Sequence, residues 1–271
     1  MKVNTLKQKW QRGEAALNGW LSIGNGFAAE VMAAQGFDSI TIDMQHGVID
    51  YAQCVSMLQS MTAYDVTPMV RVPWLDPGAI MKALDAGAYG IICPMINNRK
   101  EAETLVSYMR YPPHGTRSFG PTRITYSAGA DYAATANEQV LCLAMIETAE
   151  AMSNLEEIVS TPGLDGVYIG PADLSIGVTN GRLAPGLDRQ EDEMITNIKR
   201  ILEAAKSAGI NACLHCGSPE YAAQAIGWGF HLCTLGSDAR LLAQAASDCV
   251  GKARELSGMT TTSTDSTTGG Y

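Results

Sequence analysis

The 271-residue chain has no surplus of positive charge, because 19 lysines and arginines stand against 28 acidic residues and give a net charge of −9. This balance argues against nucleic acid or an anionic membrane as a partner. No apolar stretch reaches the roughly 18 residues that a membrane span requires. The polar residues 1–9 contain no apolar signal region. The sequence therefore predicts a cytoplasmic protein with neither a membrane nor a nucleic-acid partner.

A disulfide framework is also absent from the pattern of cysteines. There are seven of them, an odd number, and most lie in apolar runs. Such residues are usually buried, reduced thiols of a cytosolic protein. Cys213 and Cys216 have the C-x-x-C spacing of redox and zinc sites, but no second pair follows. The spacing on a single strand favours a chance arrangement over either site.

One pattern recurs about eight times along the chain: a short apolar run, a turn, and a longer segment with helical periodicity. The runs barely alternate between polar and apolar residues, as is typical of parallel strands covered on both faces. The predicted strands are 19–24, 39–43, 68–72, 90–95, 140–147, 166–170, 210–215 and 231–236. The predicted helices include 28–34, 78–86, 149–160, 192–207 and 219–226.

Eight such units predict an α/β protein, a single (β/α)₈ TIM barrel. We expect the barrel domain to span residues 1–257 and the Ser/Thr/Gly-rich residues 258–271 to form a disordered tail. Residues 111–138 interrupt the rhythm as a long insertion rich in proline and glycine. Insertions of this length are usually functional or form contacts between subunits.

None of the eight lysines falls in a predicted strand. An enzyme that forms a Schiff base with a carbonyl substrate needs a desolvated amine inside the barrel. The sequence therefore excludes that mechanism, and carbonyl chemistry in this barrel would need a metal.

Polar residues gather where the predicted strands end, the face at which TIM barrels carry their chemistry. Glu147 and Asp173 are 26 residues apart, about one β/α unit, so they follow neighbouring strands. Two carboxylates, waters and a chelating substrate suit Mg²⁺ or Mn²⁺. The structural alternative makes Glu147 an ion-pair partner of Arg71 and Asp173 a helix N-cap.

Other strand ends supply candidates for acid–base and charge-stabilising roles. His46 could act as a general base held in its tautomer by Asp43 or Asp85, or could be a structural histidine. Arg71 could stabilise a developing oxyanion or simply pair with an acid across the barrel mouth. Trp20 and Leu214 could line the pocket, although packing within the strands explains them equally well.

At these residues the chain resembles the HpcH/HpaI class II pyruvate-dependent aldolases, typified by 4-hydroxy-2-oxoheptanedioate aldolase. The resemblance runs from about Leu6 to Leu256. The matching stretches are Gly36-Phe-Asp, Asp43-Met-Gln-His46, Val70-Arg-Val-Pro73, Leu84-Asp-Ala-Gly87, Arg110–Pro121, Ile146-Glu-Thr148 and Asp165–Ser175.

The resemblance implies a barrel of the phosphoenolpyruvate/pyruvate type and a site carried over position by position. Glu147 and Asp173 match the ligands of a divalent ion (Mg²⁺, Mn²⁺ or Co²⁺), and Arg71 matches the arginine beside the enolate oxygen. His46 matches the acid/base histidine, and Asp85 the acid that orients a histidine of the same or a neighbouring subunit. The backbone of residues 170–172 (Gly170, Pro171 and Ala172) would hold the substrate carboxylate.

The implied reaction is the reversible aldol cleavage of 4-hydroxy-2-oxo acids to pyruvate and an aldehyde through a metal-bound pyruvate enolate. The implied assembly is a homohexamer, a trimer of dimers. In one place the chain departs from the family's Asp-Gly-Glu-His turn, because it has Met44 and Gln45 there. Gln45, which would face the substrate, lacks the usual charge, and this leaves the identity of the acceptor open.

The sequence leaves one alternative function open and argues against another. The same site could decarboxylate oxaloacetate or transfer the enolate to an unusual acceptor, as macrophomate synthase does. A barrel retained only for binding or regulation would be expected to have lost site residues, whereas all are present here. The aldehyde, the physiological metal and the direction of the reaction are not determined by the sequence.

Overall fold

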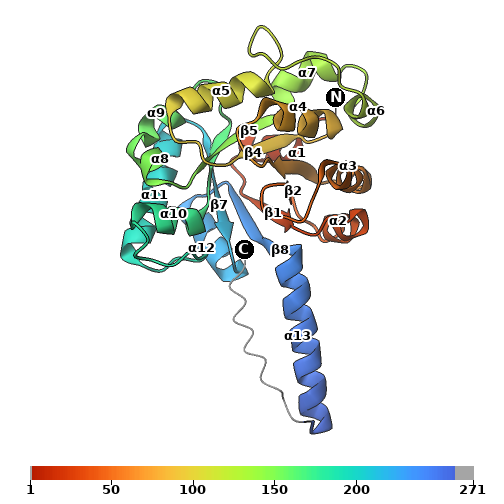
Figure 1. The fold of residues 1–271 in the computed structure, drawn as a ribbon, viewed down its shortest axis with the longest axis vertical. Helices are drawn as coiled ribbons and strands as arrows, with labels where there is room; N and C mark the ends of the chain where they lie inside the picture. Colours follow the sequence, from red (N-terminus) through yellow and green to blue (C-terminus); the bar gives the residue numbers. More distant parts are fainter. Residues whose placement is uncertain (1, 260–271) are drawn as a thin grey trace.

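Eight parallel strands form a closed barrel in the computed structural model, which describes residues 2–259 (Figure 1). Each strand pairs with the next, and β8 returns to β1. The predicted TIM barrel is confirmed. The strands are β1 (Ala16–Leu21), β2 (Ser39–Asp43), β3 (Thr67–Arg71), β4 (Gly90–Cys93), β5 (Leu141–Ile146), β6 (Gly166–Ile169), β7 (Asn211–Cys216) and β8 (Leu232–Ser237).

Helices surround the barrel, and several begin and end where the sequence signals them. Asp76 accepts a hydrogen bond from the Ala79 N–H, Pro77 is the first helical residue, and Gly87 ends α4 with a positive φ. The predicted helix 149–160 is broken in two at Asn154. The helices are α1 (Thr5–Gln11), α2 (Gly26–Ala33), α3 (Tyr51–Ser60), the 3₁₀ turn η1 (Met61–Ala63), α4 (Pro77–Ala86), α5 (Arg99–Met109), α6 (Arg123–Ala128), α7 (Tyr132–Gln139), α8 (Ala149–Ser153), α9 (Leu155–Val159), α10 (Pro171–Val178), α11 (Asp192–Ser207), α12 (Pro219–Trp228) and α13 (Asp238–Ser257).

The strands bury both of their faces. Outward-facing side chains such as Ile91 and Leu214 join a large cluster beneath the surrounding helices. Inward-facing side chains such as Met69, Leu143 and Met145 fill the barrel itself. Burial on both faces explains why the strands read as continuous apolar runs in the sequence.

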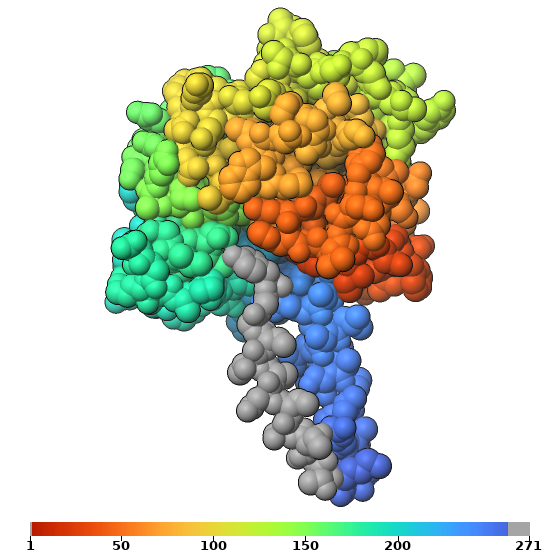
Figure 2. Space-filling model, viewed as in Figure 1, coloured from red at the N-terminus to blue at the C-terminus, as the bar shows by residue number. Residues whose placement is uncertain are grey.

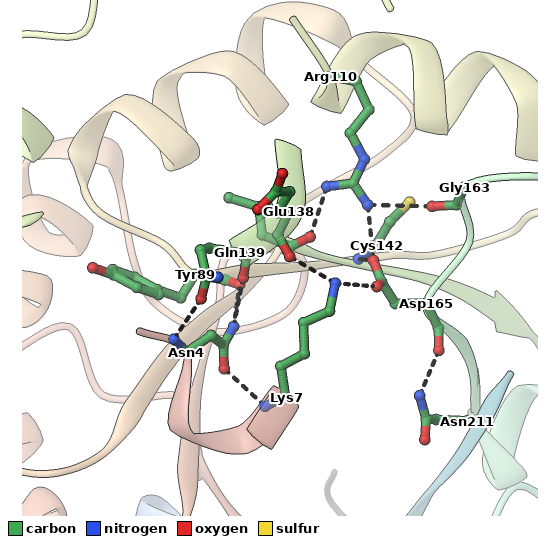
Figure 3. A network of polar contacts seen from close by, with 11 residues as sticks. Asn4, Lys7, Tyr89, Arg110, Glu138, Gln139, Cys142, Gly163, Asp165 and Asn211 are labelled. Atoms are coloured by element: carbon green, nitrogen blue, oxygen red, sulfur yellow. Dashed lines mark hydrogen bonds and ion pairs between the residues drawn. The ribbon is translucent and has the colours of Figure 1, made fainter. Parts of the chain in front are cut away.

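Short helix α1 closes the N-terminal end of the barrel through a polar network (Figure 3). Asp165 accepts hydrogen bonds from Lys7 (3.0 Å), Arg110 (2.8 Å) and the Cys142 N–H (2.9 Å). The side chain of Asn4 donates to the backbone oxygens of Gln139 and Tyr89. These contacts join segments far apart in the sequence and give each of these polar groups a hydrogen-bond partner. They stabilise the end of the barrel that in this fold carries no chemistry.

The insertion at 111–138 carries helices α6 and α7, so it is more ordered than its proline and glycine content suggests. Its aromatic side chains form a small core of their own with Ile124. Arg117, whose side chain is fully buried, lies between Asp85 (2.6 Å) and the hydroxyl of Tyr132 (3.0 Å). This ion pair attaches the insertion to α4.

The last helix, α13, projects away from the barrel (Figures 1 and 2). Of its 20 residues only Asp238 is buried. Leu241, Leu242, Val250 and Leu256 are exposed. No helix within residues 2–259 is long and apolar enough to cross a membrane. Most of the predicted tail, residues 260–271, lies outside the described residues.

Candidate active site

The strand register places Asp43 and Arg71 side by side at the C-terminal ends of β2 and β3. The Arg71 guanidinium donates two hydrogen bonds to the Asp43 carboxylate, at 2.8 and 2.7 Å. Burial opposes both charges, but the pairing outweighs it, so the pKa of Asp43 is lowered and that of Arg71 is raised. Arg71 also stacks on the Trp20 ring, 4.8 Å from its centroid. Its Nη1 takes part in neither of these two bonds, and Arg71 lines the cavity described below.

Glu147 follows β5 directly and is only 2% exposed to solvent. Its carboxylate accepts a hydrogen bond from the Met95 N–H at 2.8 Å. It forms no salt bridge within the described part of the chain, because Arg71 binds Asp43 instead. Burial raises the pKa of Glu147 to about 7, and the charge of Asp173 adds to this, while the Met95 N–H and Arg71 oppose it. An ionised carboxylate buried in this way is energetically costly unless a cation binds to it.

The turn after β6 brings the second acid and a helix N-terminus to the same place. Gly170 caps α10, Pro171 is the first helical residue, and Asp173 lies in the first turn. The backbone N–H groups of this first turn have no partner within the helix and can hold an anion. A Cβ atom on Gly170 would collide with Oε2 of Glu147 and approach the Met145 side chain. Only glycine therefore lets the turn approach Glu147 so closely.

A narrow cavity at this end of the barrel brings together most of the predicted site. Its wall is formed by Trp20, Arg71, Met145, Glu147, Gly170, Pro171, Ala172, Asp173, Leu187 and His215. Asp43 lies directly behind this wall, bonded to Arg71 and to the indole N–H of Trp20 at 3.3 Å.

Four predicted residues lie elsewhere. Leu214 points outward into the helix-covered core, and its neighbour His215 faces the cavity instead. Asp85 lies on α4, in the ion pair with Arg117. His46 is exposed in the loop after β2, where its backbone N–H donates to Asp43 at 3.3 Å. Gln45 lies in the same loop, and its side-chain oxygen is buried without a hydrogen-bond donor.

The sequence did not single out His215, which lines the cavity, or the buried Tyr168 that contacts it. The Tyr168 hydroxyl lies 3.0 Å from Nδ1 of His215, and the histidine ring packs edge-on against Trp20, with 4.7 Å between centroids. Burial, followed by the charge of Arg71, lowers the pKa of His215 to about 3, so the ring is neutral. Side chains alternate between the two faces of β7, but the apolar sequence of this strand does not show which face points into the barrel. The sequence alone therefore does not identify His215 as a cavity residue.

The donor set of the cavity fits a hard divalent ion that keeps part of its shell for water and substrate. Glu147 and Asp173 supply the carboxylates. Within residues 2–259 no group of three or more His, Cys, Asp or Glu side chains forms a closed metal site. Cys213 points into the barrel and Cys216 outward, so these two thiols do not form a chelating pair.

Comparison with known proteins identifies the family of the chain. Residues 19–245 match the family model of HpcH/HpaI aldolase/citrate lyase. A hydroxypyruvate/pyruvate aldolase of Rhizorhabdus wittichii is 42% identical, over 94% of this chain and 100% of that protein. A 4-hydroxy-2-oxo-heptane-1,7-dioate aldolase of Shigella flexneri is 34% identical, over 90% of each chain.

A crystal structure from the same family shows the same fold. It is that of an HpcH/HpaI aldolase/citrate lyase family protein from Burkholderia cenocepacia, with a TM-score of 0.86 and 32% identity, over 93% of this chain and all of that one. The chain therefore belongs to the HpcH/HpaI family and is an enzyme of the aldolase and lyase class.

Proposed function

We propose that the enzyme is a divalent-metal-dependent aldolase that cleaves 4-hydroxy-2-oxo acids to pyruvate and an aldehyde, or joins them. The observation that carries the proposal is Glu147, a buried carboxylate that faces the cavity beside Asp173 and has no basic partner among the described residues. Such a charge is costly unless a cation binds there. Glu147 and Asp173 would hold the ion, which would act as a Lewis acid toward the keto group of the substrate.

The residues around this pair bind and orient the 2-oxo acid. The N-terminal turn of α10 offers backbone N–H groups to the substrate carboxylate at Ala172. Arg71, fixed by its two hydrogen bonds to Asp43, presents Nη1 to the oxygen on which negative charge develops. Because Asp43 already neutralises this guanidinium, Arg71 contributes a preorganised donor without adding net charge.

Proton transfer is assigned to His46. It lies in the exposed loop after β2, and its backbone N–H donates to the Asp43 carboxylate that also holds Arg71. Asp85 is engaged by Arg117 in the outer layer, so a role in orienting a histidine requires a neighbouring subunit. Gln45 lies in the same loop, and its buried side-chain oxygen, which has no hydrogen-bond donor, could accept from a group on the ligand.

We also propose that the enzyme is a homo-oligomer, a hexamer built as a trimer of dimers. Helix α13 supports assembly, because its apolar side chains at 241, 242, 250 and 256 are exposed and the helix projects from the barrel (Figure 2). Light scattering should show a hexamer. The double substitution Leu241→Ser and Leu242→Ser should reduce it to smaller species, and an unchanged mass would contradict the role of α13.

The buried thiols at 54, 93, 142, 213, 216 and 233 suit the reducing cytoplasm, which we propose as the location of the enzyme.

The decisive experiment measures pyruvate release from a panel of 4-hydroxy-2-oxo acids after exhaustive chelation and after Mg²⁺, Mn²⁺ or Co²⁺ is restored. Activity should vanish with EDTA and return with the ion. Glu147→Gln should remain inactive with any ion, while Glu157→Gln, on the exposed face of α9, should behave like the parent enzyme. Release that survives chelation would refute the metal mechanism. Oxaloacetate assayed in parallel separates cleavage from decarboxylation.

A further inference from the structure

A chain of hydrogen bonds runs through the barrel interior and ends at the cavity on His215. Ser39 and Thr41 donate to the side-chain oxygen of Asn18, at 2.8 and 3.1 Å. The Asn18 amide then donates to the Thr234 hydroxyl at 2.9 Å. The Thr234 oxygen lies 2.6 Å from the Tyr168 hydroxyl, which in turn lies 3.0 Å from Nδ1 of His215.

The direction of these bonds fixes the position of each hydrogen. Thr234 is fully buried and already accepts from Asn18. Its own hydrogen has one acceptor among the described residues, the oxygen of Tyr168. If Tyr168 donated to Thr234 instead, the Thr234 hydrogen would be buried without a partner, which native interiors avoid. Thr234 therefore donates to Tyr168, and Tyr168 donates to Nδ1 of His215.

A neutral histidine that accepts at Nδ1 carries its proton on Nε2. Among the described residues, the hydrogen bond of the His215 ring is made at Nδ1 with Tyr168, and His215 lines the cavity. The Trp20 ring packs against the imidazole and holds it in place. The interior network thus sets an oriented, uncharged N–H donor in the wall of the active site.

The strand register shows which part of a substrate meets this donor. Ile146 pairs with Ile169 and Ile169 with Leu214, so Glu147, Gly170 and His215 follow at one level on β5, β6 and β7. A 2-oxo acid held over Gly170 has Glu147 on one side and His215 on the other. If its carboxylate and keto oxygens are directed toward α10 and Glu147, its third carbon would lie on the side of His215.

We propose that His215 donates from Nε2 to a hydroxyl group on the third carbon of the 2-oxo acid, and so selects hydroxypyruvate over pyruvate as the nucleophile. This assignment rests on the function proposed above. A neutral donor suits a hydroxyl better than a second carboxylate, for which a charge-assisted partner would be needed. The one cation in the cavity wall, Arg71, is already bonded to Asp43.

The test compares kcat/KM for hydroxypyruvate and for pyruvate with one common aldehyde. His215→Phe keeps a flat ring but loses the donor, and should lower the hydroxypyruvate-to-pyruvate ratio about tenfold, the worth of one hydrogen bond. His215→Gln keeps an N–H group and should retain most of the preference. An unchanged ratio in His215→Phe would overturn the proposal. A parent enzyme inactive on both substrates would instead refute the proposed function.

A second measurement does not depend on turnover. The chain has four histidines, so nitrogen-15 spectra of histidine-labelled enzyme can be assigned with His215→Phe as the reference. They should show a neutral ring protonated on Nε2, and this Nε2–H signal should shift when hydroxypyruvate is added but much less with pyruvate. Tyr168→Phe should weaken the tautomer preference. A proton found on Nδ1 in the parent enzyme would overturn the assignment.

Discussion

Replacing Glu147 by glutamine should stabilise the metal-free enzyme at high pH while abolishing its activity. Ionising a carboxyl group with a pKa of about 7 instead of its ordinary 4.5 costs about 3 kcal/mol of folding free energy. No reduction for solvent screening applies, because Glu147 is 2% exposed. Glutamine keeps an oxygen for the Met95 N–H and removes only the charge.

The pH dependence of this cost follows from its sign. The raised pKa means that the folded protein binds a proton more tightly than the unfolded chain does, so the penalty is absent below about pH 4.5, where both are protonated. It grows as the pH rises and is complete above about pH 7. The difference in unfolding free energy between Glu147→Gln and the parent enzyme should therefore be near zero at pH 4.5 and about 3 kcal/mol at pH 8.

Urea unfolding in EDTA at both pH values measures this difference, with Glu157→Gln as the exposed control. Adding Mn²⁺ at pH 8 should then stabilise the parent enzyme and leave Glu147→Gln nearly unchanged, because binding to the folded state alone raises stability. A Glu147→Gln variant that is no more stable than the parent at pH 8 in EDTA would refute the claim that this carboxylate is held without a compensating charge.

Three further substitutions test the geometry. Gly170→Ala forces the turn away from Glu147 and should lower kcat/KM by about 100-fold. A Cβ atom on Gly227 would meet no atom within 4 Å, so Gly227→Ala should keep the activity of the parent enzyme. Equal kcat/KM values for the two variants would contradict the close approach of the turn to Glu147. Asp85→Asn leaves the buried Arg117 without its anion and should lower the unfolding free energy, measured by thermal unfolding, by about 3 kcal/mol. A loss near zero would show that this ion pair is no more stabilising than an exposed one. Asp43→Asn frees Arg71 to rotate and should reduce kcat more than it raises KM, an effect that steady-state kinetics would show or exclude.

Much of the barrel could be predicted from the sequence because each unit carries its own local signals. Strand 39–43 and helix 192–207 have the predicted bounds. The insertion was harder, since α6 and α7 owe their order to a tertiary core around Tyr132 that no local pattern indicates. The sequence does not predict that helix α13 projects, because its apolar residues do not pack against the barrel.

The candidate site shows the same division. Glu147, Asp173 and Arg71 could be located because a charged residue after an apolar run stands out in any sequence. Which acid binds Arg71 depends on the register of β2 and β3, and only the structure shows it to be Asp43. The sequence suggested Leu214 as a pocket residue, whereas the structure places His215 there, because successive side chains of a strand point to opposite faces.

The polar network around Asp165 (Figure 3) precedes β6, whereas Glu147 follows β5, so this network and the cavity lie at opposite ends of the barrel and have no residue in common. Substitutions at distant sites without shared partners combine additively. Changes that retune the choice of substrate at His215 or Gln45 should therefore leave the Asp165 end intact. The scaffold can tolerate evolutionary drift in specificity without losing its capacity to fold.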